Sequence, residues 1–139
     1  MTDLEQAKHI LTEQDCTCVL VRGDTVRIGT DRGIKPLVLW LEAGADCRGF
    51  SAADKVVGRA TAFLYVQLGV QEVYASVMSR GAIEVLQEFG IAHSYANEVE
   101  AILNRKKDGF CPMESAVREV TDPRTAWQVL CAKYHQLNP

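Results

Sequence analysis

The sequence predicts an α/β protein whose mixed sheet lies between two layers of helices, a three-layer α/β/α arrangement. Strand-like stretches at residues 17–22 and 25–29 flank Gly23-Asp24, and a two-residue loop that begins with glycine is typical of an antiparallel β-hairpin. Further along the chain, predicted helices and strands alternate, which favours parallel strands joined by right-handed crossovers. A hairpin followed by parallel strands makes the sheet mixed.

The longest predicted element is a helix over residues 52–68. Ser51 and Asp54 have the capping-box spacing, in which a serine caps the helix and an acid three residues later completes the cap. Apolar side chains then recur every three or four residues, as on one face of a helix. Gly69 stands where a glycine commonly ends a helix, and the apolar residues 70–77 follow as a buried strand.

Caps and prolines set the ends of the other predicted elements. Ser79 and Asp122 are good N-cap residues, and Pro36, Pro112 and Pro123 suit the first turn of a helix. The remaining expectations are helices over residues 2–13, 36–44, 79–90, 97–103, 112–120 and 123–134, a strand over 91–95 and a polar loop over 104–110. Two strands are therefore expected after the hairpin.

Composition narrows the class of protein. The chain has 139 residues and a net charge of −3, so we expect a single domain over 1–139 that binds no nucleic acid, because such binders usually carry a basic excess. It contains no long apolar run and no leader with a basic and then an apolar region, which predicts a cytoplasmic protein without a membrane contact. The five cysteines form no C-x-x-C pair and are expected to be reduced thiols, with no metal site and no cofactor.

Three motifs carry a resemblance to a known family: residues 32–37 (RGIKPL), 53–58 (ADKVVG) and 111–114 (CPME). Within a match that runs from about Cys18 to Leu130, they resemble an uncharacterised prokaryotic family, the domain of unknown function DUF1893. The resemblance implies a cytidine-deaminase-like fold. It also implies a possible homo-oligomer, because domains with that fold often self-associate.

The chain departs from true zinc deaminases at the metal site. Those enzymes hold an H-x-E motif at the start of the second core helix and P-C-x-x-C at the start of the third. The resemblance places these motifs at residues 53–55, which read ADK, and at residues 78–82, which read MSRGA. Neither stretch offers the expected histidine or cysteine ligands or the expected glutamate, and zinc-bound hydroxide is the nucleophile of the deamination. The resemblance therefore implies a deaminase-like scaffold without zinc chemistry.

The first candidate site is the start of the predicted long helix. On a helix, Asp54 would share a face with Gly58, and Lys55 would share a face with Arg59. A carboxylate beside two cations could bind a polar ligand or transfer a proton, and a glycine inside a helix suggests that another group comes close to it. The alternative is that Asp54 only caps the helix and that Gly58 only lets a neighbouring element pack closely.

The second candidate site is the loop that carries Arg32 and Lys35 on either side of Gly33, ahead of the helix that begins near Pro36. Two cations and the free N–H groups of a helix N-terminus could together hold a phosphate or a carboxylate. The alternative is a solvated loop whose basic residues serve solubility.

The third candidate site is the stretch from Cys111 to Glu114. Pro112 at the first helical position makes Cys111 the N-cap, where a helix N-terminus lowers the pKa of a thiol. Glu114 at the third position could bond back to the cap or act as a base, although its charge would oppose that lowering. The alternative is a buried thiol beside a capping glutamate.

The preferred hypothesis is a small-molecule binding domain for a nucleotide-like or other anionic ligand. The expected ligand-binding residues are Arg32, Lys35, Asp54, Lys55, Arg59, Cys111 and Glu114. One alternative is a metal-free enzyme that uses Asp54 or Glu114 for acid–base chemistry, or Cys111 as a nucleophile. Another is an oligomerisation or interaction module without a ligand. Among the aromatic residues, Tyr65 alone is considered for a role outside core packing.

Overall fold

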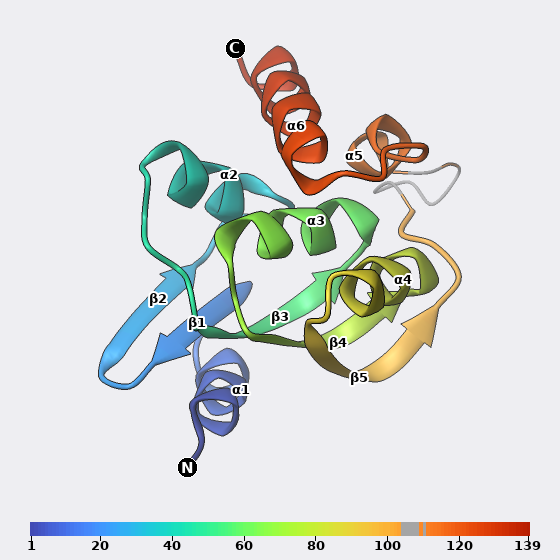
Figure 1. Ribbon diagram of the computed structural model, residues 1–139. Coiled ribbons are helices and arrows are strands. Elements are labelled where there is room, and N and C mark those ends of the chain that lie inside the picture. The colour runs from blue at the N-terminus through green and yellow to red at the C-terminus, as the bar shows by residue number, and fades with distance from the viewer. Residues whose placement is uncertain (104–108, 110) are drawn as a thin grey trace.

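The computed structural model describes residues 1–103, 109 and 111–139, and it is an α/β structure built on one five-stranded sheet (Figure 1). Its helices are α1 (Asp3–Glu13), α2 (Lys35–Glu42), α3 (Arg59–Leu68), α4 (Arg80–Glu88), α5 (Pro112–Ala116) and α6 (Pro123–Leu137). Its strands are β1 (Cys18–Arg22), β2 (Thr25–Gly29), β3 (Ser51–Val57), β4 (Glu72–Ser79) and β5 (Ala92–Val99). Apart from Gly109, the polar loop expected over residues 104–110 lies outside the described residues.

The sheet is mixed, as the sequence predicts. Its strand order is β2-β1-β3-β4-β5, so β2 and β5 are the two edges. Strand β1 runs antiparallel to both β2 and β3, whereas β3, β4 and β5 run parallel to one another. The predicted hairpin joins β1 to β2 through Gly23, whose φ of 60° is a conformation that glycine adopts without strain. The parallel strands are joined through α3 and α4.

Helices cover both faces of the sheet, which confirms the three-layer arrangement. Helix α1 packs alone on one face, and α2, α3 and α4 cover the other (Figure 1). The main core fills the space between the sheet and these three helices, and its large members include Leu20, Phe50, Phe63 and Leu86. Helices α5 and α6 pack on the outer side of α3, where Leu130 joins the same core.

Local sequence signals set most helix ends correctly. Thr2 caps α1 in a capping box with Glu5. The Ser79 hydroxyl accepts from the Ala82 N–H at 3.1 Å and caps α4. Asp122 caps α6, also as expected. These signals succeed because each needs only neighbours in the sequence.

The expected helix over residues 52–68 is wrong in its first third, because residues 51–57 form β3. The Ser51 hydroxyl donates to Glu72 Oε2 at 2.6 Å on the neighbouring strand, so Ser51 does not cap a helix. The helix begins only at Arg59, with Gly58 as its N-cap, and ends at Gly69 as expected. A short apolar run fits a buried strand as well as a helix. Pairing on both sides, with β1 and β4, decides for the strand.

The expected helix over residues 97–103 is also wrong, because β5 continues to Val99 and pairs with β4 as far as Ser79. Helix α5 ends at Ala116 rather than near residue 120. The sheet therefore has three strands after the hairpin instead of the expected two. In β5 the hydrogen bonds to β4 outweigh the weak local preference of Asn97 for a helix cap.

Candidate functional site

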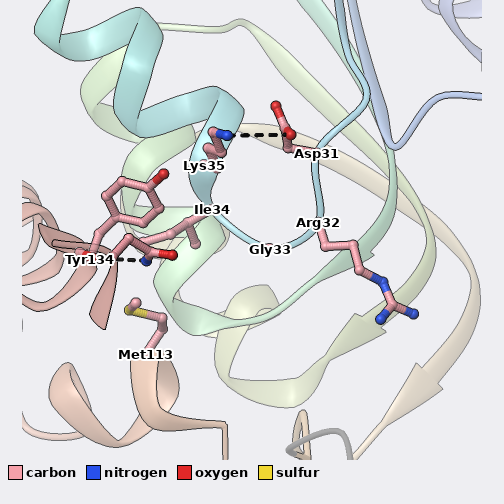
Figure 2. Close-up of a pocket in the computed structure, with 8 residues that line it drawn as sticks. Asp31, Arg32, Gly33, Ile34, Lys35, Met113 and Tyr134 are labelled. Atoms are coloured by element: carbon pink, nitrogen blue, oxygen red, sulfur yellow. Dashed lines mark hydrogen bonds and ion pairs between the residues drawn. The ribbon is translucent and has the colours of Figure 1, made fainter. Parts of the chain in front are cut away.

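The predicted site residues do not line one common cavity. The α2 cavity, of about 390 Å³, is lined by Asp31, Arg32, Gly33, Ile34, Lys35, Met113, Tyr134 and Asn138 (Figure 2). The α3 cavity, of about 140 Å³, is lined by Arg59, Ser79, Gly81, Glu100, Ala101, Glu114, Ser115 and Arg118. Two predicted residues therefore lie at each cavity, and Asp54, Lys55 and Cys111 line neither.

The α2 cavity lies at the start of α2. The Thr17 hydroxyl donates to the Asp31 carbonyl at 2.7 Å and anchors the loop that leads into the helix. Gly33 has a φ of 67°, which lets the loop turn tightly before Lys35. The N-cap residue of α2 is Ile34, which supplies no side-chain hydrogen bond. The amino end of α2 therefore forms part of the cavity wall without a side-chain cap.

The charges around this cavity sum to a positive value. Lys35 Nζ lies 3.5 Å from Asp31 Oδ1, an exposed ion pair in which both side chains keep contact with solvent. Arg32 has no acid of its own in this loop, and its side chain extends away from Tyr134 and Met113 (Figure 2). Two cations against one carboxylate leave one net positive charge beside a helix N-terminus, which carries about half a positive charge itself.

The opposite wall of the α2 cavity comes from the C-terminal helices. Met113 of α5 and Tyr134 of α6 face the loop across the cavity (Figure 2). Ile34, which is buried, adds a third apolar surface. The Asn138 side-chain amide donates to the Tyr134 carbonyl at 2.9 Å and closes the end of α6. The cavity thus combines a cationic loop with an aromatic and an aliphatic wall.

The N-terminus of α3 carries a cap that comes from α5. Glu114 Oε1 accepts from the Arg59 N–H at 2.8 Å, and Oε2 accepts from the Ala60 N–H at 2.7 Å. A Cβ atom on Gly58 would lie 2.7 Å from both Glu114 Cδ and Ile102 Cγ1. The close approach that the sequence suggested at Gly58 is therefore made by Glu114. Burial raises the pKa of Glu114, and the hydrogen bonds from Ala60 and Arg59 oppose that rise.

Arg59 holds the segment after α5 against α3. Its Nε donates to the Val117 carbonyl at 3.1 Å, and Nη2 donates to the Val120 carbonyl. Its guanidinium carbon lies 4.9 Å from the centre of the Phe63 ring, in cation–π contact. Glu114 of α5 therefore accepts hydrogen bonds from the backbone of α3, and Arg59 of α3 donates hydrogen bonds to the backbone that follows α5. Together the two side chains hold these segments against each other.

Asp54 lies inside the fold on β3 and is only 7% exposed. The Tyr65 hydroxyl donates to Asp54 Oδ2 at 2.6 Å, and the Val56 N–H donates to Oδ1 at 3.2 Å. Burial raises the pKa of Asp54 to about 6, although both of these hydrogen bonds lower it. Burial also raises the pKa of Tyr65 well above its usual range. Asp54 is therefore a buried acid paired with a tyrosine and not the capping acid that the sequence suggested.

The strand also separates Asp54 from Lys55. Alternate residues of a strand point to opposite faces, so Lys55 lies on the α1 face and is exposed. The shared helical face expected for Lys55 and Arg59 does not exist, because these residues belong to β3 and α3. The sequence analysis singled out Tyr65 but did not predict its hydrogen bond to Asp54, because it placed both residues on one helix.

Cys111 is the N-cap of α5, as predicted. Its side chain makes no capping hydrogen bond, and it is half-buried. The Glu114 carboxylate, which the sequence allowed to bond back to this cap, instead bonds to the amides of α3. The thiol and the carboxylate therefore serve different parts of the fold.

In the part of the chain that the structure describes, no three His, Cys, Asp or Glu side chains are grouped so that they could hold a metal ion. Residues 53–55, where the resemblance placed the first deaminase motif, lie in β3 and not at a helix start. That part of the correspondence is wrong, because the helix begins only at Arg59, after the strand has ended.

The wall of the α2 cavity that comes from the C-terminal helices was not predicted as part of this site. Met113, Tyr134 and Asn138 come from α5 and α6, about a hundred residues after the loop. Their sequence signals are those of ordinary helix residues, so only the packing of α6 against α2 and α3 reveals them.

None of the helices in the described part of the chain combines the length and the hydropathy needed to cross a membrane.

The chain belongs to the DUF1893 family of domains of unknown function (TM1506), whose model matches residues 6–133. It is similar to the crystal structure of a DUF1893 family protein, TM1506, from Thermotoga maritima, with a TM-score of 0.87 and 25% sequence identity. That similarity covers 96% of this chain and 91% of the Thermotoga chain. No curated protein matches the chain. The family that the three motifs suggested is thereby confirmed, and the cytidine-deaminase-like label stays a prediction.

Proposed function

We propose that the protein is a small-molecule binding domain that holds an anionic ligand in the α2 cavity. The observation that carries this proposal is the uncapped N-terminus of α2 in the wall of a cavity of about 390 Å³. The free N–H groups of a helix N-terminus and its positive dipole favour phosphate or carboxylate groups. Lys35 and Arg32 add two positive charges, of which Asp31 offsets one.

The walls suggest the rest of the ligand. The volume falls within the range of about 300–1,000 Å³ that is usual for small-molecule sites. Tyr134, Met113 and Ile34 offer an aromatic and an aliphatic surface opposite the cationic loop. A ligand with an anionic group at the start of α2 and a flat apolar group against Tyr134 fits this distribution. A nucleoside monophosphate has that chemistry.

In this proposal the predicted site residues have two kinds of role. Lys35 meets the ligand, and Arg32, whose side chain extends away from Tyr134, adds positive charge at the rim of the cavity. Glu114 and Arg59 position the α5 region, and through it Met113, on the far side of the cavity. Asp54 lies inside the fold, bonded to Tyr65, and has neither role.

The test is calorimetric titration with AMP, adenosine and inorganic phosphate. We expect AMP to bind more tightly than either phosphate or adenosine, because only AMP engages both the cationic loop and the apolar wall. Lys35→Ala should weaken AMP binding about tenfold, the usual size of one lost charge-assisted hydrogen bond. Tyr134→Ala should weaken AMP binding without changing the affinity for phosphate.

A matched control separates a site from a general effect of charge. Arg124→Ala removes one positive charge at the opposite end of α6 from Tyr134 and should leave AMP binding unchanged. Equal losses of AMP affinity in Lys35→Ala and Arg124→Ala would show that AMP binding depends only on the net charge of the protein. Binding of AMP that survives Lys35→Ala, Arg32→Ala and Tyr134→Ala together would place the ligand elsewhere.

A further inference from the structure

The hairpin of β1 and β2 brings two arginines together on the face of the sheet that carries the main core. Leu20 of β1, a core residue, pairs with Arg27 of β2, and Arg22 follows Leu20 by two residues. Arg22 and Arg27 are therefore diagonal neighbours on one face. Their guanidinium carbons lie 4.6 and 5.5 Å from the centre of the same buried ring, Phe50. Like charges this close on neighbouring strands destabilise a sheet unless an anion joins them.

Arg27 lacks hydrogen-bond acceptors for its guanidinium. Its Nε is buried and has no hydrogen-bond partner, and its Nη2 reaches only the Asp46 carbonyl, at 3.5 Å. A bond of that length is weak, because good N–H···O bonds are about 2.7–3.2 Å long. Among the described residues, no carboxylate forms an ion pair with Arg27. Burial of a cation without acceptors is costly, so the site calls for an acceptor that the described part of the chain does not supply.

The acid nearest to this pair is already occupied by a third arginine. The Nε and the backbone N–H of Arg48 both donate to Asp46 Oδ1 at 3.2 Å, and these bonds hold the pKa of Asp46 below its usual range. Asp46 Oδ2 lies 3.9 Å from Arg22 Nη1, which donates to the Arg48 carbonyl at 2.7 Å. These residues lie in the loop from α2 to β3, which runs beside the hairpin (Figure 1). Asp24 on the hairpin turn is exposed and forms no ion pair with the described residues. Even with Asp24 included, three arginines face two acids.

We propose that Arg22 and Arg27 bind a phosphate group, free or esterified, at the hairpin. A phosphate carries about −1.5 to −2 charges at pH 7 and offers three acceptor oxygens, which suits two guanidiniums with spare donors. The planar fork of a guanidinium binds phosphate through paired N–H bonds. The Arg22 side chain is 46% exposed, so solvent reaches the pair. The Phe50 ring holds both guanidiniums in place by cation–π contact.

This phosphate site is separate from the α2 cavity, whose lining includes neither Arg22 nor Arg27. The two sites should also differ in what they prefer. The α2 cavity has Tyr134 in its wall and should favour AMP over phosphate. At the hairpin the aromatic ring, Phe50, is fully buried beneath the guanidiniums and cannot stack on a base, so AMP and phosphate should bind there equally well. Either site can therefore fail without the other.

NMR titration of the full chain with inorganic phosphate tests the proposal at the Nε–H signals of Arg22 and Arg27. We expect both signals to shift together and to saturate with one dissociation constant. The signal of Arg124, an exposed arginine on α6, should stay in place. Glycerol phosphate should produce the same shifts if the natural ligand is an ester, and shifts from inorganic phosphate alone would identify the free ion as the ligand. Arginine signals that do not move, or an equal shift at Arg124, overturn the proposal.

Variants that keep the charge test the role of the guanidinium fork. Arg22→Lys and Arg27→Lys should each weaken phosphate binding about tenfold, read at the remaining arginine of the pair, because lysine keeps the charge and lacks the fork. Arg124→Lys is the matched control and should bind as the original chain does. Lys35→Ala, which alters the α2 cavity, should leave the shifts at the pair intact. Equal losses in Arg27→Lys and Arg124→Lys, or shifts at the pair that vanish in Lys35→Ala, would exclude a site at the hairpin.

Discussion

The amino ends of α2 and α3 differ in what lies against them, and α2 presents one backbone N–H fewer because its second residue is Pro36. Both helices lack a side-chain cap from their own N-cap residue, which is Ile34 in α2 and Gly58 in α3. In α3 the Glu114 carboxylate, brought in from α5, accepts from two amides at 2.8 and 2.7 Å. In α2 the N-cap side chain makes no hydrogen bond, and among the described residues the helix end lines a cavity of about 390 Å³.

The difference teaches where this fold has room for an anion. A helix N-terminus binds a carboxylate from the protein or from a ligand by the same hydrogen bonds and dipole. Gly58 lets Glu114 approach the backbone of α3 directly, so that position is filled from within. At α2 the nearest carboxylate, Asp31, is turned to the Lys35 ammonium, and the helix end stays open. The amino end of α3 therefore serves stability, and the amino end of α2 is suited to binding a ligand.

The largest expected effect on stability comes from removing the Glu114 carboxylate from the amino end of α3. Glu114→Ala leaves the Arg59 and Ala60 amides without their acceptor, and we expect the unfolding free energy to fall by about 3–4 kcal/mol. Urea denaturation measures this loss. Glu114→Gln, which keeps one acceptor oxygen, should lose clearly less. A loss below about 0.5 kcal/mol in Glu114→Ala would show that α3 needs no cap from α5.

The second effect concerns a buried carboxylate that has no helix end to stabilise it. Because burial raises the pKa of Asp54 from 3.8 to about 6, the folded protein binds this proton more tightly than the unfolded chain does. The contribution of Asp54 to the unfolding free energy should therefore be highest below pH 3.8 and fall as the pH rises to about 6. The gap of about two units corresponds to at most about 3 kcal/mol.

Denaturation of Asp54→Asn across this pH range measures that contribution. The difference in unfolding free energy between the variant and the original chain should change between pH 3.8 and about 6, in favour of the variant at higher pH. Tyr74→Phe is a control tyrosine change on the other face of the sheet, and its difference should stay level with pH. A difference for Asp54→Asn that is equally level would mean that Asp54 ionises as easily in the folded protein as in the unfolded chain.

A smaller effect is expected from blocking the approach of Glu114 to α3. Gly58→Ala puts a Cβ atom 2.7 Å from Glu114 Cδ and Ile102 Cγ1, so we expect a loss of about 2 kcal/mol in unfolding free energy. Gly81→Ala is the control, since its Cβ would meet Arg59 Cβ at 3.4 Å and helix α4 favours alanine. Equal stability of the two variants would mean that the α5 region moves aside without loss.

The smallest effect on stability is expected at the open helix end. Lys35→Glu places an acid in the first turn of α2, where it gains from the dipole and loses the ion pair with Asp31, so the net change should stay below about 1 kcal/mol. Its effect on anion affinity should be much larger, because one cation is replaced by a competing carboxylate. Denaturation and AMP titration of the same variant measure both. A large loss of stability with unchanged AMP affinity would reverse the roles assigned to the two helix ends.

Most of the fold could be predicted from neighbours in the sequence. The hairpin at Gly23, the cap at Ser79 and the helix end at Gly69 all depend on a few consecutive residues, and all three are confirmed. Strand β3 could not be predicted in this way. Its Ser51 and Asp54 imitate a capping box, and only the pairing with β1 and β4 shows that they belong to a sheet.

The candidate site divides along the same line. The loop with Arg32 and Lys35 was visible because cations, a glycine and a helix start are adjacent in the sequence. The partners of that loop in α5 and α6 were not visible, and neither was the bond from Glu114 to α3 or from Tyr65 to Asp54. Each of these contacts joins residues from different elements.

By itself the sequence determined the family, the α/β class, the hairpin and most helix ends, because local hydrogen bonds and backbone preferences act between near neighbours. The tertiary structure alone decided that residues 51–57 are a strand, that Glu114 fills the end of α3 and that the end of α2 stays open. Those outcomes depend on which surfaces are buried together. The N–H groups at the amino end of a helix need hydrogen-bond acceptors. Only the packing of the elements determines whether a side chain of the same protein supplies them.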